Sequence, residues 1–288
     1  MDEVGVRRPP AALLELARAA LLEDVGRGDV TSRVTVGEEA WARARFVARE
    51  ELIVSGMEAA RAVFFEVGEE VGFTVFVREG NLAPAGSVLA EAEGPARPIL
   101  AAERVALNLV MRLSGIATFT SRYVEAVTGT GAVITDTRKT TPGLRLLEKA
   151  AVRAGGGTNH RAGLDDGVLI KDNHLALAGG VTVAVRRARA NAPHLLKVEV
   201  EVESLGMLEE AISAGADAVL LDNMTPDEVR EAVALARRSR PDLLVEVSGG
   251  VNLRTVRAYA EAGPDLISVG ALTHSAPAAD VSLEVEPC

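Results

Sequence analysis

Basic side chains gather in three short runs of this sequence. Residues 136–143 read Asp-Thr-Arg-Lys-Thr-Thr-Pro-Gly, residues 159–161 read Asn-His-Arg, and residues 171–174 read Lys-Asp-Asn-His. The chain has only four lysines, and two of them, Lys139 and Lys171, lie in these runs. Because the net charge is −10, a local cationic cluster is best explained by a ligand with several negative charges. The predicted cluster consists of Arg138, Lys139, His160, Arg161 and Lys171.

Acidic residues recur with a period of two in residues 197–203, which read Lys-Val-Glu-Val-Glu-Val-Glu. In a strand, this spacing puts the valines on one face and the three glutamates, Glu199, Glu201 and Glu203, on the other. A solvated edge strand would explain the pattern, but in a barrel the valines pack outward and the carboxylates face the interior. Carboxylates there need basic side chains or a divalent cation as counter-charge. Asp222 either caps the helix that follows it or joins Glu201 in holding Mg²⁺ against ligand phosphates.

Two glycine-containing segments lie one strand-helix unit apart near the end of the chain. They are Ser248-Gly249-Gly250 and Gly270-Ala271. Glycine lets the backbone approach a phosphate closely, and backbone amides at the start of a helix attract anions. One such segment alone is as often a turn, but phosphate sites in barrels often use the loops after the last two strands. The pair therefore predicts a phosphate site.

The elements that must position these residues alternate between short strands and helices from residue 133 onward. Helices at 225–238 and 252–262 are two examples, and this rhythm predicts a parallel sheet. Nearly every strand ends in a polar residue, as expected for a barrel, whose strand ends converge on one mouth. A doubly wound sheet would concentrate such residues at one switch point. Only six or seven units are visible, so we expect an open barrel. The predicted strands are 133–136, 167–171, 195–201, 218–222, 243–248 and 266–270.

The first third of the chain has a mixed pattern of helices and strands. A long helix is expected over residues 98–112, with a break at 114–115 where it meets the next domain, and a continuation beyond. We therefore predict an N-terminal domain over residues 1–114, the barrel over 115–274, and a tail over 275–288 that returns to the first domain. The remaining elements expected are helices at 9–24 and 57–70, a strand or hairpin at 42–54 and a strand at 73–77.

Bulk properties exclude several classes of function. The net charge of −10 argues against nucleic acid or an anionic membrane as the main partner. No apolar run has the length of a membrane span. The single cysteine, Cys288, is the last residue, so an internal disulfide is impossible and a reducing compartment fits. We expect a cytoplasmic protein.

The ordered set of motifs resembles the quinolinate phosphoribosyltransferase family over nearly the whole chain. Each motif is short, but the series is highly specific. The motifs are Gly28-Asp29-Val30-Thr31, Glu103-Arg104-Val105-Ala106-Leu107-Asn108, Leu113-Ser114-Gly115-Ile116-Ala117-Thr118, Thr137-Arg138-Lys139-Thr140, Asn159-His160-Arg161, Lys171-Asp172-Asn173-His174, Glu199-Val200-Glu201-Val202, Leu221-Asp222-Asn223, Ser248-Gly249-Gly250 and Gly270-Ala271-Leu272.

This resemblance implies an N-terminal α/β sandwich, an open α/β barrel, and an enzyme of NAD biosynthesis that joins quinolinate to phosphoribosyl pyrophosphate with loss of CO₂. It also implies an obligate homodimer in which Arg104 of the partner completes each site. Catalysis is assigned to Lys139, Lys171, Glu201 and Asp222, with Mg²⁺ held by the last two. The quinolinate site comprises Arg138, His160, Arg161 and Lys171, and the phosphoribosyl pyrophosphate site comprises Lys139, Glu201, Asp222, Ser248, Gly249, Gly250 and Gly270. Thr137 is a further substrate-binding residue.

Several alternatives stay open at this stage. A related phosphoribosyltransferase could use nicotinate or the substrate of molybdenum-linked homologues as its acceptor. A Schiff-base barrel aldolase would use Lys171 as its nucleophile. A non-catalytic binding protein would not need Glu201 and Asp222 beside a phosphate site. The sequence leaves open the roles of His174 and His274, the kinetic order, and whether dimers assemble further into a hexamer of dimers.

Overall fold

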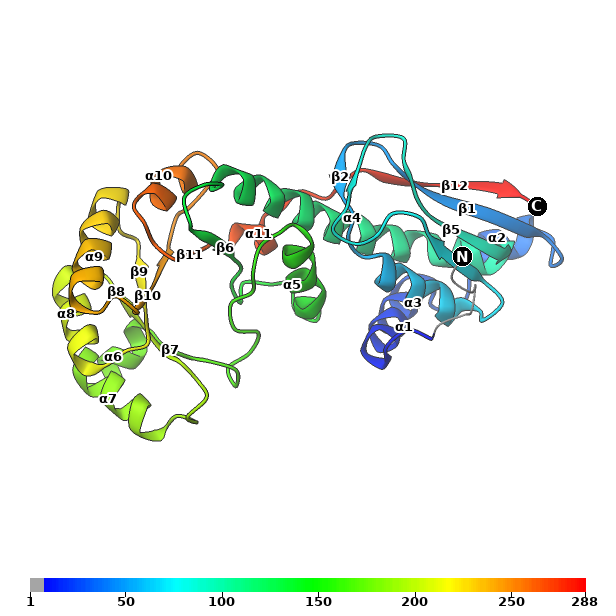
Figure 1. Cartoon of the computed structure of the whole chain (residues 1–288). Coiled ribbons are helices and arrows are strands. Elements are labelled where there is room, and N and C mark those ends of the chain that lie inside the picture. The colour runs from blue at the N-terminus through cyan, green and yellow to red at the C-terminus, as the bar shows by residue number, and fades with distance from the viewer. Residues whose placement is uncertain (1–7) are drawn as a thin grey trace. The chain divides into compact units, whose positions relative to one another are not determined.

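The computed structural model describes residues 8–288, which form two compact units (Figure 1). The first unit contains residues 8–119, Pro142–Gly156 and Ala276–Cys288, and the second contains Thr120–Thr141 and Gly157–Ser275. The first seven residues of the expected N-terminal domain lie outside the described part of the chain. Between residues 8 and 288, no helix is long and apolar enough to cross a membrane.

The first unit is built on a four-stranded antiparallel sheet with the order β12-β1-β5-β3. Strand β1 alternates buried alanines with arginines that form ion pairs across the sheet, such as Arg45 with Glu91 at 2.9 Å. Phe46 of β1 packs edge-on against Phe64 of α3 and Phe73 of β3, which joins helix and sheet in one core. The elements are α1 (Ala11–Val25), α2 (Val30–Thr35), β1 (Trp41–Ala48), β2 (Leu52–Ile53), α3 (Met57–Val67), β3 (Gly72–Val75), β4 (Leu82–Ala83), β5 (Val88–Pro95), α4 (Ala96–Ala126, whose last residues from Thr120 belong to the second unit), α5 (Arg145–Ala154) and β12 (Val281–Pro287).

Helix α4 is continuous, so the predicted break at residues 114–115 is wrong. Ser114 is fully buried, and its hydroxyl donates to the carbonyl of Ser55 at 2.9 Å and accepts from the Ser55 amide at 3.0 Å. A Cβ atom on Gly115 would lie only 2.1 Å from the carbonyl oxygen of Pro277. A glycine at position 115 therefore lets the chain at Pro277 pass close to helix α4. This packing outweighs the low helix propensity of glycine.

The second unit is an open α/β barrel. Its six parallel strands follow the order β6-β11-β10-β9-β8-β7, and the helices α7, α8 and α9 lie along the outside of the strands (Figure 1). Strands β7 to β11 pair in chain order, and β6 pairs with β11, as they would in a barrel. Strands β6 and β7 are consecutive in the chain but do not pair, so the barrel is open there. The predicted open barrel is confirmed.

All six predicted strands of the barrel are present, with shifts of up to three residues at their ends. The largest shift is in β8, which begins at Val198 because the preceding residues form a turn from Pro193 to Leu196. Helix α9 begins where Thr225 and Glu228 form a capping box. The elements are β6 (Val133–Thr135), β7 (Val168–Ile170), α6 (Asp172–Ala178), α7 (Val181–Asn191), β8 (Val198–Val202), α8 (Leu205–Ala214), β9 (Ala218–Asp222), α9 (Pro226–Ser239), β10 (Leu244–Ser248), α10 (Val256–Glu261), β11 (Leu266–Ser268) and α11 (Ala271–His274).

Candidate active site

A cavity of about 720 Å³ lies where the barrel strands end at their carboxyl termini. The structure brings every predicted site residue of the barrel to this cavity. Arg104 instead lies on α4 in the first unit, where its side chain is exposed. The predicted residues that line the cavity are Thr137, Arg138, Lys139, His160, Arg161, Lys171, Glu201, Asp222, Ser248, Gly249, Gly250 and Gly270. Other polar residues in its lining are Asn223, Glu246, Ser268 and His274.

Lys171 and Glu201 form an ion pair across the ends of β7 and β8. Lysine Nζ lies 2.7 Å from Oε2 of Glu201, whose residue is only 8% exposed. Strand β8 alternates as expected, because its valines are buried while Glu199 and Glu201 reach residues on the cavity side. Glu203 follows the end of β8 and is exposed to solvent.

Asp222 ends the neighbouring strand β9 and carries a perturbed carboxyl. Burial raises its pKa, as does the negative charge of Glu201, while Lys171 and Lys139 act in the opposite direction. Its Oδ2 accepts a hydrogen bond from the side chain of Asn223 at 2.6 Å. The carboxylates of Glu201 and Asp222 repel each other in a partly buried cavity, and a divalent cation between them would relieve this repulsion. Mg²⁺ prefers oxygen ligands and commonly takes one or two carboxylates.

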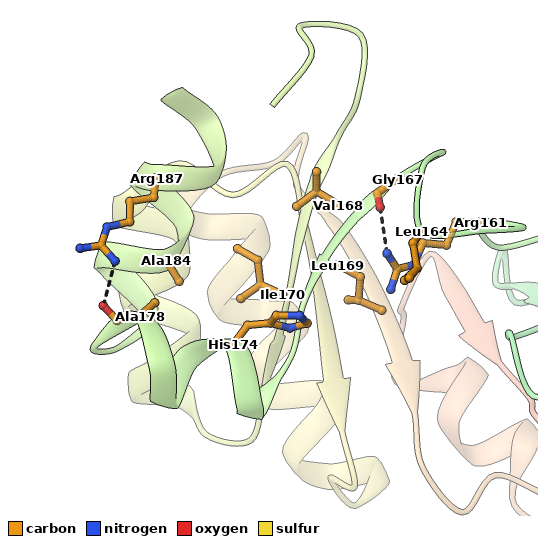
Figure 2. Close-up of a pocket in the computed structure, with 10 residues that line it drawn as sticks. All are labelled: Arg161, Leu164, Gly167, Val168, Leu169, Ile170, His174, Ala178, Ala184 and Arg187. Atoms are coloured by element: carbon orange, nitrogen blue, oxygen red, sulfur yellow. Dashed lines mark hydrogen bonds between the residues drawn. The ribbon is translucent and has the colours of Figure 1, made fainter. Parts of the chain in front are cut away.

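Arg161 and Arg138 concentrate positive charge on another part of the cavity wall. One guanidinium nitrogen of Arg161 donates to the carbonyl oxygen of Gly167 at 2.9 Å, as Figure 2 shows. Burial lowers the pKa of Arg161, and so does the nearby charge of Arg138. Within residues 8–288, the buried Nε of Arg161 has no hydrogen-bond partner. A carboxylate ligand would supply both the missing acceptor and the missing negative charge.

The backbone after β10 is shaped by residues with positive φ. Gly249 has φ of 93°, and a Cβ atom there would lie 2.2 Å from Oδ1 of Asn223. Asn223 itself has φ of 56°, and its amide donates to the carbonyl of Ser248 at 3.1 Å. A Cβ atom on Gly270 would lie 3.1 Å from the side chain of Lys139. Only glycine fits both places without movement. Gly250 has no atom within 4 Å of its Cβ position, so a glycine cradle of Gly249, Gly250 and Gly270 presents exposed backbone in the same cavity as Lys139, which suits a phosphate.

Two family models match this chain. The N-terminal domain of quinolinate phosphoribosyl transferase matches residues 29–114, and the C-terminal domain of the same enzyme matches residues 116–284. The chain belongs to this family. The resemblance drawn from the ordered motifs is therefore confirmed.

Relatives with this family's activity in their names cover almost the whole chain. The chain is 44% identical over 273 residues to the probable carboxylating nicotinate-nucleotide pyrophosphorylase of Bacillus subtilis, with 95% of this chain and 93% of that protein covered. The carboxylating nicotinate-nucleotide pyrophosphorylase of Mycobacterium leprae is 43% identical over 277 residues, with 95% and 97% covered. The solved nicotinate-nucleotide pyrophosphorylase of Francisella tularensis superposes with a TM-score of 0.91 at 39% identity, covering 99% of this chain and 100% of that one.

Two acidic residues of this quinolinate phosphoribosyltransferase site were not predicted. Asp136 is fully buried and accepts hydrogen bonds from the side chain of Asn159 at 2.6 Å and the backbone amide of His160 at 2.9 Å, so it holds the family's Asn-His-Arg motif in place. Glu246 lines the cavity and is 2% exposed. The signal for Glu246 was available, because β10 alternates Val-Glu-Val-Ser and puts Glu246 on the same face as Ser248.

A second cavity of the quinolinate phosphoribosyltransferase barrel, about 360 Å³ in volume, lies beside β7 and the helices that follow it (Figure 2). Its lining is largely apolar and includes Val168, Ile170 and Ala184. His174 also lines it, and Nδ1 of His174 accepts a hydrogen bond from the backbone amide of Lys171 at 2.9 Å. His174 therefore fixes the start of α6 and the position of Lys171.

Proposed function

We propose that this protein transfers phosphoribosyl from phosphoribosyl pyrophosphate to quinolinate and releases pyrophosphate and CO₂, giving nicotinate mononucleotide. The observation that carries the proposal is a single cavity that combines two partly buried arginines, a pair of acidic strand ends and a glycine cradle. Membership of the quinolinate phosphoribosyltransferase family, with relatives over 40% identical along most of the chain, supports the same reaction.

The acceptor is proposed to bind at the cationic wall of the cavity. Quinolinate carries two carboxylates on adjacent ring atoms, and Arg138 with Arg161 offers two guanidinium groups for them. The lowered pKa of Arg161 reflects burial beside another cation, and a bound dianion offsets that cost. A monocarboxylate would leave more of the positive charge uncompensated.

Phosphoribosyl pyrophosphate is proposed to bind between the acidic pair and the glycine cradle. The backbone at Gly250 has open space beside it, and Lys139 lies beside Gly270. We propose that Glu201 and Asp222 hold Mg²⁺, which would supply positive charge to the pyrophosphate when bound. Lys171 pairs with Glu201 in this structure and would shift toward the substrates' anionic groups when they bind.

The chemistry that these residues perform is mainly positioning and charge stabilisation. The pyridine nitrogen attacks C1 of the ribose, and the bond from C1 to the pyrophosphate oxygen breaks. Positive charge then develops on the sugar, where the carboxylate of Glu201 stabilises it, while Lys139 stabilises the departing pyrophosphate. The positively charged ring nitrogen next draws electron density from the neighbouring carbon, so its carboxylate leaves as CO₂.

Two further properties are proposed with the activity, a shared-site homodimer and a cytoplasmic location. The enzyme is proposed to act as a homodimer whose partner contributes Arg104, an exposed side chain that the family's motif includes. The single cysteine supports a reducing compartment, and we place the protein in the cytoplasm. Equilibrium sedimentation of the purified protein and of Arg104→Ala tests whether both are dimers. An activity assay on the same samples tests the role of Arg104, since the substitution should lower activity without dissociating the dimer.

The activity is tested by mixing the protein with Mg²⁺, phosphoribosyl pyrophosphate and either quinolinate or nicotinate. We expect pyrophosphate and CO₂ in equal amounts with quinolinate and neither product with nicotinate. Pyrophosphate without CO₂ would assign a different acceptor. Arg161→Ala should lose most quinolinate turnover, whereas Arg230→Ala, on the exposed face of α9, provides a matched control. No pyrophosphate from folded protein would refute the proposal.

The aldolase alternative depends on Lys171 acting as a neutral amine. In this structure, Nζ of Lys171 pairs with the carboxylate of Glu201 at 2.7 Å, and Arg138 and Arg161 line the same cavity, an arrangement that suits the binding of anions. Treatment with borohydride in the presence of candidate carbonyl substrates should therefore leave Lys171 unmodified.

A further inference from the structure

A buried cluster on the cavity wall contains two carboxyls that have no part in the reaction described so far. Glu246 of β10, Glu199 of β8 and His160 come together there, with one ligand-type atom from each within 4.8 Å of the others. Their three side chains are mostly shielded from solvent, and Glu246 and His160 line the cavity directly. The cluster is therefore next to the proposed acceptor site and withdrawn from bulk water.

The hydrogen-bond pattern indicates which partner the imidazole of His160 donates to, and the hydrogen bond with Glu199 raises the pKa of His160. Nδ1 of His160 accepts from the backbone amide of Arg161 at 2.7 Å, so the ring hydrogen is on Nε2. Nε2 lies 3.1 Å from Oε2 of Glu199 but 3.7 Å from Oε1 of Glu246. Glu199 therefore receives the ring hydrogen, and His160 has none left for Glu246.

Glu246 is consequently a buried carboxyl without a donor for one of its oxygens. Its Oε1 is inaccessible to solvent and has no hydrogen-bond partner among residues 8–288. A carboxylate in that position would be costly, so the group keeps its own proton. Burial raises the pKa of Glu246 to about 7, and Glu199 and Asp136 also raise it, against the opposing effects of His160 and Ser268. Near neutral pH, the cavity wall thus holds a proton.

The proposed reaction needs a proton at one defined step. When the bond between the ring carbon and its carboxylate breaks, the electron pair stays on that carbon, and a C–H bond must form. The arginines of the cavity are too weakly acidic to donate, and Lys171 is assigned to charge pairing, first with Glu201 and then with the substrates' anionic groups. Glu246 combines burial, a raised pKa and a place on the cavity wall, and it is not assigned to the metal or to the phosphates.

We propose that Glu246 is the general acid that protonates the ring carbon from which CO₂ departs. In this step, the O–H bond of Glu246 breaks, the C–H bond of the product forms, and Glu246 is left as a carboxylate. A proton from water restores the carboxyl after the product leaves. His160 is a positioning residue that keeps Glu199 satisfied and leaves Glu246 protonated. The assignment rests on the proposed transfer to quinolinate.

Glu246→Gln tests this assignment because glutamine has the same shape and no acidic proton. In single turnovers with Mg²⁺ and both substrates, pyrophosphate release should stay within about twofold of the parent protein, while formation of the decarboxylated product slows on the order of 100-fold. The intermediate that carries both carboxylates should accumulate. Glu231→Gln, an identical change on the exposed face of α9, is the control and should match the parent protein in both steps.

A second measurement reads the proton donor directly. In mixed light and heavy water, the deuterium content of the new C–H bond reflects the group that donates, because a carboxyl and a water molecule discriminate differently between the isotopes. We expect Glu246→Gln to change this content and Glu231→Gln to leave it unchanged. An unchanged content together with an unchanged decarboxylation rate would overturn the assignment, even when the parent protein releases pyrophosphate and CO₂ from quinolinate normally.

A divalent cation is the competing explanation for the same cluster. One imidazole nitrogen and two carboxylates are suitable ligands. Manganese binding to the substrate-free protein can be measured by its effect on water proton relaxation. This measurement distinguishes a metal site at the cluster from a general acid at Glu246. Tight binding that Glu246→Gln abolishes and Asp222→Asn preserves would overturn the acid assignment. Binding that Asp222→Asn abolishes and Glu246→Gln preserves is the expected result.

Discussion

Glu246→Gln should also make protein stability less dependent on pH. Raising the pKa of this carboxyl from 4.5 to about 7 in the folded state corresponds to about 3 kcal/mol, since each unit is worth about 1.4 kcal/mol. The unfolded chain loses this proton at the lower value and the folded protein at the higher one. Between them the folded state binds more protons, so its stability falls as pH rises and levels off above the higher value.

Glutamine cannot ionise and escapes this loss. Relative to the parent protein, the variant should therefore gain up to about 3 kcal/mol between about pH 4.5 and pH 8, whatever constant offset the amide introduces. Urea denaturation followed by circular dichroism at several pH values measures this difference. Glu231→Gln provides the background, because its carboxyl is exposed. A difference between parent and variant that stays flat across this range would show that Glu246 is not a buried neutral acid.

Three other perturbations follow from the geometry. Arg161→Ala should raise KM for quinolinate at least about tenfold, because a charged hydrogen bond to the substrate is lost. KM for phosphoribosyl pyrophosphate should change much less, which steady-state kinetics with each substrate varied in turn would measure. Equal changes in the two KM values would contradict separate subsites. Gly249→Ala forces a positive φ on alanine and a clash with Asn223, so initial rates should show a higher KM for phosphoribosyl pyrophosphate with far-ultraviolet dichroism unchanged. Gly115→Ala should destabilise the protein by about 1–3 kcal/mol, because the new methyl group meets the carbonyl of Pro277, and this clash outweighs the better helix propensity of alanine. A variant that is more stable than the parent protein in thermal unfolding would refute the close contact between helix α4 and the segment at Pro277.

Local sequence patterns were sufficient for the barrel and for most of its site. The strands carry apolar residues with turn or polar residues at their carboxyl ends, and in a parallel barrel these ends must share one mouth. Lys171 and Asp222 could therefore be assigned to one cavity without knowledge of the intervening helices. The alternation in β8 likewise predicted the direction of Glu201, because a strand has only two faces.

The same local rules failed where a residue's role depends on a distant neighbour. Ser114 and Gly115 have low helix propensity, yet both lie inside a continuous helix. Ser114 is there because its hydroxyl bonds the backbone of Ser55, and Gly115 because the chain at Pro277 passes too close for a side chain. Arg104 has no local feature that separates it from other exposed helix arginines, and only the family resemblance assigns it a role.

By itself, the sequence determined the parallel sheet of an open barrel, the chemical types gathered at its mouth and the family, since these depend on periodicity and on ordered motifs along the chain. Tertiary structure alone decided that the barrel opens between β6 and β7, that Nε2 of His160 pairs with Glu199, and that Glu246 is buried with a raised pKa and no hydrogen-bond partner for its Oε1 among residues 8–288. The physical reason is that pairing, desolvation and electrostatic repulsion depend on distances in space. Periodicity along a strand states which way a carboxyl points and not which charges it meets there.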